Sequence, residues 1–141
     1  MIGQCCVKHW SKTQSTISLS SGEAELHGIT QGAAQALGVK SLMADMGWSI
    51  NINLHSDATA AIGIARRKGL GKIRHLDTAE LWTQEKIRSR EINIFKVLGA
   101  ENMADALTKY FDRAILQQSL AKMGLVQKSG RPELAPKAMG A

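Results

Sequence analysis

The sequence predicts an α/β domain, because short alternating strands are interleaved with segments of helical periodicity. Residues 50–54 alternate apolar and polar side chains, and "EINIFKVL" at residues 91–98 does the same. Helical patterns fill residues 57–67 and 76–90, and a longer helical segment precedes the first of these strands. Strands that alternate with helices favour a sheet whose strands pair at least partly in parallel.

Helix-capping and helix-breaking residues mark the ends of the expected elements along the chain. The strands and helices are predicted at residues 4–10, 20–46, 50–54, 57–67, 76–90, 91–98 and 103–123. Gly47 ends the long helix and Gly69 follows the next one. Four apolar residues are expected on the buried side of the helix at residues 76–90: Leu76, Leu81, Trp82 and Ile87. We expect residues 1–126 to form the folded domain and residues 127–141, which hold both prolines, to be a disordered tail.

The composition limits the class of protein. The chain has 141 residues, enough for one domain, with 44% hydrophobic residues and a net charge of +6. A basic chain suits a polyanionic partner such as nucleic acid. Cys5 and Cys6 are adjacent, which excludes a disulfide framework and predicts small buried thiols in an intracellular protein. No apolar run approaches the roughly 20 residues of a membrane span.

Two glutamates open the long helix in "SLSSGEAELHGI", residues 18–29. Ser20 and Glu23 match the S-x-x-E capping box, which gives Glu23 a structural role. Glu25 has no such role and borders the apolar stripe that begins with Leu26 and Ile29. A carboxylate in that position needs a cation or hydrogen-bond donors to compensate it.

Three carboxylates stand at three separate strand-to-helix approaches: Glu25, Asp57 and Asp105. Each has a structural alternative, since Asp57 could be a helix N-cap and Asp105 an acid in a first helical turn. Strand ends are where functional groups gather in α/β sheets. Converging carboxylates can hold Mg²⁺, and two such ions can catalyse displacement at a phosphodiester. We therefore predict that the three acids form a catalytic site with Mg²⁺.

Four segments resemble the ribonuclease H (RNase H) domain of copia-type retrotransposon Pol polyproteins. They are "HWSKTQSTISLSSGEAEL", "INLHSDATAAIGIA", "KIRHLDTAELWTQEKI" and "INIFKVLGAENMADALTK", which run in family order between residues 5 and 125. The resemblance implies an RNase H-like mixed sheet with flanking helices and Mg²⁺-dependent cleavage of RNA in RNA–DNA hybrids. It assigns the metal-ligand and catalytic roles to Glu25, Asp57 and Asp105.

The chain departs from the family pattern at its start. The family's first catalytic aspartate lies on an opening strand that would precede residue 1, so the expected fold is N-terminally truncated. It lacks the first strand and most or all of the second. The resemblance therefore predicts a fragment that is inactive by itself, with weak or absent Mg²⁺ binding, and an upstream polyprotein segment as a partner supplying the missing strands.

Basic residues gather between the second and third helices and predict phosphate contacts. They are Arg66, Arg67, Lys68, Lys72, Arg74 and His75. A solvated helix end and loop is the structural alternative for this cluster. Two other functions stay open on the sequence: a non-catalytic, basic nucleic-acid-binding remnant, and a hydrolytic domain completed by a neighbouring polypeptide.

Overall fold

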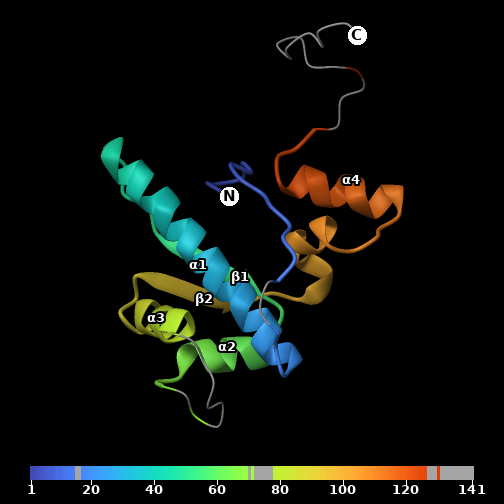
Figure 1. Ribbon diagram of the computed structural model, residues 1–141. Helices are drawn as coiled ribbons and strands as arrows, with labels where there is room; N and C mark the ends of the chain where they lie inside the picture. Colours follow the sequence, from blue (N-terminus) through green and yellow to red (C-terminus); the bar gives the residue numbers. More distant parts are fainter. Residues whose placement is uncertain (15–16, 70, 72–77, 127–129, 131–141) are drawn as a thin grey trace, which may run out of the picture. The chain divides into compact units, whose positions relative to one another are not determined.

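The computed structural model describes residues 1–14, 17–69, 71, 78–126 and 130 (Figure 1). The chain divides into two compact units, one formed by Lys12–Asn102 and the other by Met1–Ser11 with Met103–Ala141. The expected single domain over residues 1–126 stays a prediction. The disordered tail expected at residues 127–141 lies, apart from Gly130, outside the described residues.

The first unit begins with the long helix α1, Ser21–Asp45. Its N-cap Ser20 accepts a hydrogen bond on Oγ from the backbone N–H of Glu23, at 3.2 Å. The Glu23 carboxylate in turn accepts from the N–H of Leu19, at 2.9 Å. This reciprocal pair satisfies two N–H groups at the helix start, and it confirms the structural role predicted for Glu23. At the other end Gly47 has a φ of 83°, the left-handed conformation that suits glycine after a helix.

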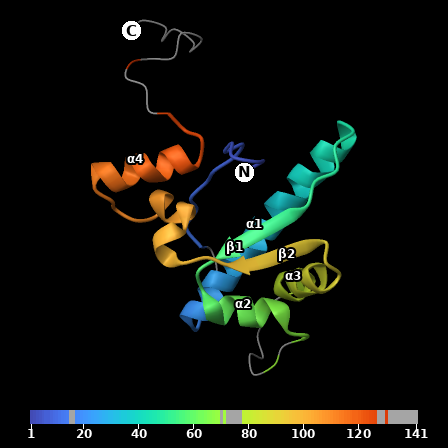
Figure 2. The same ribbon diagram turned by 180° about the vertical axis from the view of Figure 1, so that it is seen from behind.

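Two strands form a parallel sheet, as the alternation of strands and helices predicted (Figure 2). Strand β1 covers Ile52–Ser56 and strand β2 covers Ile92–Lys96. Their register runs from Ile52 opposite Ile92 to Ser56 opposite Lys96. The α/β class is thus confirmed, with a purely parallel pair of strands in the part of the chain that the structure describes.

Three helices cover one face of this sheet. Helix α2 is Thr59–Arg66 and helix α3 is Thr78–Arg88. Apolar side chains of α1 and α2 pack with those of both strands, and the fully or nearly fully buried ones include Leu26, Ile29, Ala61, Ile62, Ile92 and Ile94. The core therefore lies between the sheet and its helices, and α1 lies behind both strands in Figure 2.

The buried side of α3 is both apolar and polar. Trp82 and Ile87 pack against the core, as the sequence predicted, and polar residues that it did not predict are buried beside them. Leu76 lies outside the described residues. Leu81, Trp82 and Ile87 are only partly buried, whereas Glu80, Thr83 and Gln84 are buried. Each of these three has a partner that compensates its burial. His27 Nδ1 of α1 lies 2.7 Å from Glu80 Oε1, Thr83 Oγ1 donates to Thr30 Oγ1, and Gln84 Nε2 donates to the carbonyl of Ile64.

The second unit differs from the prediction at both of its segments. No strand forms among the described residues 1–11; Ile2 and Cys5 make a single antiparallel bridge, and Gly3 between them has a φ of 57°. The backbone of Cys6 donates instead to the carbonyl of Met123, which ties the segment to the end of a helix. Cys5 is exposed and Cys6 half-buried, so the expectation of two buried thiols was also wrong.

The helix expected at residues 103–123 is broken. After a short 3₁₀ turn at Gly99–Glu101 comes a second 3₁₀ segment, Met103–Leu107, and α4 covers only Arg113–Lys122. The break has a local cause, because the Asp112 carboxylate accepts from the N–H of Ile115 and starts a new helix.

Candidate functional site

Asp57 lies directly after β1, at the carboxyl end of the sheet. The N-cap of α2 is Ala58, with no side-chain hydrogen bond to the helix, so the Asp57 side chain does not act as its cap. Asp57 is therefore not the N-cap of α2, which was the structural alternative for this residue. The Asp57 carboxylate faces Gly99, where a Cβ would stand 3.5 Å from Asp57 Oδ2. This is an ordinary contact distance, and the Asp57 side chain is half-buried beside Gly99.

Glu25 lies in the second turn of α1 and is exposed. Its neighbour Leu26 is fully buried and Glu23 is used at the helix start, so the two glutamates have separate environments. A Cβ on Gly22 would lie 3.3 Å from the Cβ of Ala60, which shows how closely α1 approaches α2. Glu25 and Asp57 each lie three residues from this contact, so the structure brings their two elements together.

Asp105 belongs to the second unit, in the 3₁₀ segment Met103–Leu107. Its Oδ2 accepts from the ammonium of Lys109 at 2.6 Å. The backbone N–H of Lys109 also donates to the Asp105 carbonyl, so the pair is held within one helical turn. The predicted convergence of Asp105 with Glu25 and Asp57 stays a prediction.

The chemistry of the predicted metal site rests on its donor atoms. Carboxylate oxygens, as in Glu25 and Asp57, are the hard ligands that Mg²⁺ prefers. Among the described residues, no group of three or more histidine, cysteine or acidic side chains lies close enough to hold a metal ion. The donor type therefore suits Mg²⁺, and the binding of Mg²⁺ by these residues stays a prediction.

Part of the predicted basic cluster has structural contacts. The Arg66 guanidinium donates through Nη2 to the backbone carbonyl of Ile94 in β2, at 2.7 Å. Arg67 is half-buried with its guanidinium against Gly71, and Lys68 is exposed. Lys72, Arg74 and His75 lie outside the described residues. Their role in binding nucleic acid stays a prediction.

The exposed face of the sheet carries residues that the sequence reasoning did not single out as functional. His55 and Phe95 stack across the strands with ring centroids 5.6 Å apart and planes 28° apart. Beside them Asn93 Nδ2 donates to Asn53 Oδ1 at 3.1 Å. The signal was present in the alternation of "INLH" and "INIF", which places these residues opposite the apolar ones on both strands.

Comparison with known proteins shows a similarity to a retrotransposon polyprotein. Over 105 residues the chain is 26% identical to the "Retrovirus-related Pol polyprotein from transposon TNT 1-94" of Nicotiana tabacum. The match covers 73% of this chain and 8% of that polyprotein. No family model matches the chain, and no solved structure matches it significantly. The chain is thus an α/β protein similar to a segment of a retrotransposon Pol polyprotein.

None of the helices in the described part of the chain combines the length and the apolar character that crossing a membrane requires.

Proposed function

We propose that this chain is a fragment of a retrotransposon RNase H domain whose family reaction is cleavage of RNA in RNA–DNA hybrids. The observation that carries the proposal is the position of Asp57. It follows a strand of a parallel sheet, does not cap the adjacent helix and faces a glycine. The similarity to a Pol polyprotein supports the same origin. We propose an intracellular location, because the two cysteines are adjacent and provide no disulfide framework.

In this proposal Glu25, Asp57 and Asp105 hold Mg²⁺, which when bound supplies the positive charge that stabilises both oxygens of a phosphodiester displacement. The chain's own contribution is to fix carboxylates on separate elements. Asp57 is positioned by the end of β1 and Glu25 by the capped start of α1. Arg66, Arg67 and Lys68, with Lys72, Arg74 and His75, supply contacts to phosphates.

Residues 1–141 by themselves are expected to cleave hybrid RNA negligibly. In the family pattern a further aspartate, on a strand upstream of these residues, completes the ligand set. Mg²⁺ gives up its water reluctantly, so a site short of one ligand binds it poorly. An upstream polyprotein segment that supplies the first two strands should restore cleavage.

The test compares residues 1–141 with a longer chain that carries such a segment. Cleavage of a labelled RNA–DNA hybrid in Mg²⁺ should occur only with the longer chain. Within it, Asp57→Asn should abolish turnover while hybrid binding, measured by fluorescence anisotropy, stays within about twofold. The matched control is Asp45→Asn, which removes an equal charge from the exposed end of α1 and should leave turnover unchanged. Cleavage that survives Asp57→Asn would refute the site.

The net charge of +6 favours one alternative, a non-catalytic module that binds nucleic acid through its basic residues. The same experiment separates the two. If the longer chain binds hybrid with steep salt dependence and still shows no cleavage, the alternative is supported.

A further inference from the structure

Lys96 is the last residue of β2 and places a cation at the carboxyl end of the sheet. It lies opposite Ser56 in the parallel register, and the residue after Ser56 is Asp57. In Figure 2 both strands end on the side where α2 begins. The proposed function uses Asp57 and gives Lys96 no role. All of these residues belong to the unit Lys12–Asn102, so their arrangement does not depend on the second unit.

A hydrogen bond fixes the Lys96 ammonium against the start of α2. Lys96 Nζ donates to Thr59 Oγ1 at 2.7 Å, and Thr59 is the first residue of that helix. Thr59 comes two residues after Asp57, so their Cα atoms are at most about 7 Å apart. A lysine carries its charge on a flexible four-carbon stem. This bond is therefore what holds the charge near the candidate carboxylate.

A second contact ties Asp57 to the same end of β2. A Cβ on Gly99, three residues after Lys96, would stand 3.5 Å from Asp57 Oδ2. The Val97 N–H donates to the Ser56 carbonyl at 3.0 Å, so the two strands stay paired up to the residue before Asp57. The carboxylate and the ammonium therefore belong to the same strand ends, one from each strand.

Neither of these two charges neutralises the other. Among the described residues Lys96 and Asp57 form no ion pair, and the Lys96 ammonium donates to a neutral hydroxyl. Lys86, on α3 of the same unit, does pair with a carboxylate, that of Glu91. An ammonium has three N–H donors, so Lys96 keeps its positive charge and further donors for an anion.

This combination suits a phosphate of a nucleic-acid backbone. Lysine binds phosphate as a point charge that also donates hydrogen bonds. A carboxylate such as that of Asp57 repels a phosphodiester, and a cation fixed beside it offsets that repulsion. Lys96 thus allows a phosphate to approach the end of the sheet at which Asp57 lies.

We propose that Lys96 binds a backbone phosphate of nucleic acid beside Asp57, and that Thr59 is the residue that positions its ammonium. The proposal rests on the proposed function for the class of ligand, which is nucleic acid. It adds a contact at the strand ends, separate from the basic cluster at residues 66–75. The alternative role for Lys96 is a cross-link between β2 and α2 that contributes only to stability.

The first experiment measures binding of residues 1–141 to a fluorescein-labelled RNA–DNA hybrid by anisotropy, in EDTA and at several salt concentrations. Lys96→Gln should weaken binding by about 2- to 10-fold and reduce the slope of log K against log salt by about one, the effect of one lost phosphate contact. Lys96→Arg keeps the charge and should keep the wild-type slope.

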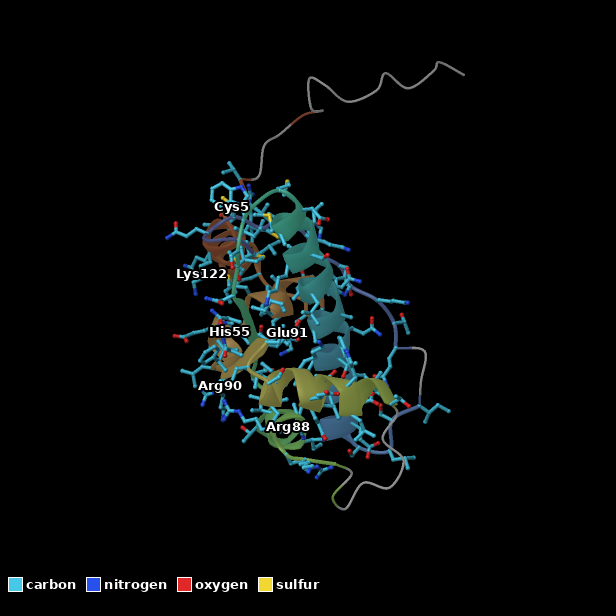
Figure 3. All side chains as sticks on the ribbon, turned by 90° about the vertical axis from the view of Figure 1, so that its left-hand side faces the viewer. Cys5, His55, Arg88, Arg90, Glu91 and Lys122 are labelled. Atoms are coloured by element: carbon cyan, nitrogen blue, oxygen red, sulfur yellow. The ribbon has the colours of Figure 1, made fainter. Side chains whose placement is uncertain are left out.

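Arg88→Gln is the matched control. It removes one exposed positive charge from the end of α3, which leads into the opposite end of β2 (Figure 3). Affinity and salt slope should both stay at the wild-type values, because this position is separated from Lys96 by the length of the strand.

Thr59→Val tests the positioning role, because valine has the shape of threonine and leaves the lysine charge in place. Binding should weaken by about 2- to 5-fold, the effect of a side chain that must be ordered on binding. In the Lys96→Gln background the same substitution should have no further effect. Tm should stay within about 2 °C of wild type for both single variants, since their hydrogen bond is exposed.

An affinity and salt slope that Lys96→Gln leaves unchanged would overturn the proposal, and a lower Tm would then identify the cross-link. Equal effects of Lys96→Gln and Arg88→Gln would also overturn it, because the attraction would be non-specific. Failure of the proposed cleavage gives a different result: the longer chain binds hybrid without cleaving it, while Lys96→Gln still reduces the salt slope and supports the contact. Absence of hybrid binding by the wild-type chain would overturn both proposals.

Discussion

The two faces of one small sheet show how burial and availability are divided in this chain. On the covered face Ile92 is 1% exposed and Ile94 is 4% exposed. Phe95, on the opposite face of the same strand, is 46% exposed. Neighbouring residues on the same strand thus differ completely in environment, because successive side chains point to opposite faces. The covered face carries the apolar packing of the unit, and the opposite face carries polar and aromatic side chains.

The largest expected effect tests the covered face. Ile92→Ala should lower the free energy of unfolding by about 2–5 kcal/mol, because it leaves a cavity against Ala33 and Ile52. Asn93→Ala, one residue further along, should change it by less than about 1 kcal/mol. Urea unfolding followed by circular dichroism measures both. Similar losses for the two variants would break the division between the faces.

A second test asks whether polar contacts on the covered side of the sheet also contribute to the stability of the fold. His27→Ala removes the partner of Glu80, which is 2% exposed and whose Oε2 has no hydrogen-bond partner among the described residues. The expected loss is about 1.5–3 kcal/mol, typical of a hydrogen bond to a charged group. Replacing both residues, as His27→Ala with Glu80→Leu, should recover part of it because no charge is then left buried. Gln31→Ala, exposed on the same helix, is the control.

The smallest expected effect concerns the exposed rim of the sheet. The hydrogen bond from Lys86 lowers the pKa of the Glu91 carboxyl below its usual range. A carboxyl whose pKa is lower in the folded state stabilises that state above the unfolded pKa and loses the effect as the pH falls through the folded pKa. Glu91→Gln should therefore lower Tm slightly at pH 7 and match wild type at about pH 3. A difference in Tm that persists at the acidic end would contradict this origin.

The pattern of the sequence was sufficient for the elements that carry strong local signals. Ser20, Glu23 and Gly47 mark the ends of α1, and the alternation in residues 50–54 and 91–98 locates both strands to within about two residues. These signals depend on neighbouring residues, so they are visible without knowledge of the fold.

The features that the sequence did not predict depend on contacts between residues that are distant in the chain. Glu80 and Gln84 are buried because His27 and the Ile64 carbonyl, distant in sequence, compensate them. Residues 4–10 form no strand, and the Cys6 N–H donates to the carbonyl of Met123 at the end of α4. At the candidate site, the position of Asp57 after a strand and before a helix predicted an N-cap as its structural alternative, because aspartate is a preferred N-cap residue. The structure places the N-cap of α2 at Ala58, and the catalytic role of Asp57 stays a prediction.

The Arg66–Ile94 hydrogen bond makes the two edges of the sheet different. Since the Val97 N–H donates to the Ser56 carbonyl, the alternating backbone groups of Asn53 and His55 point outward from β1, and those of Ile94 point outward from β2. At the outer edge of β2, the Arg66 guanidinium already donates to the carbonyl of Ile94. The outward N–H and C=O groups of β1 have no such side-chain contact among the described residues. An added strand is therefore expected to pair with the edge of β1 in preference to the edge of β2.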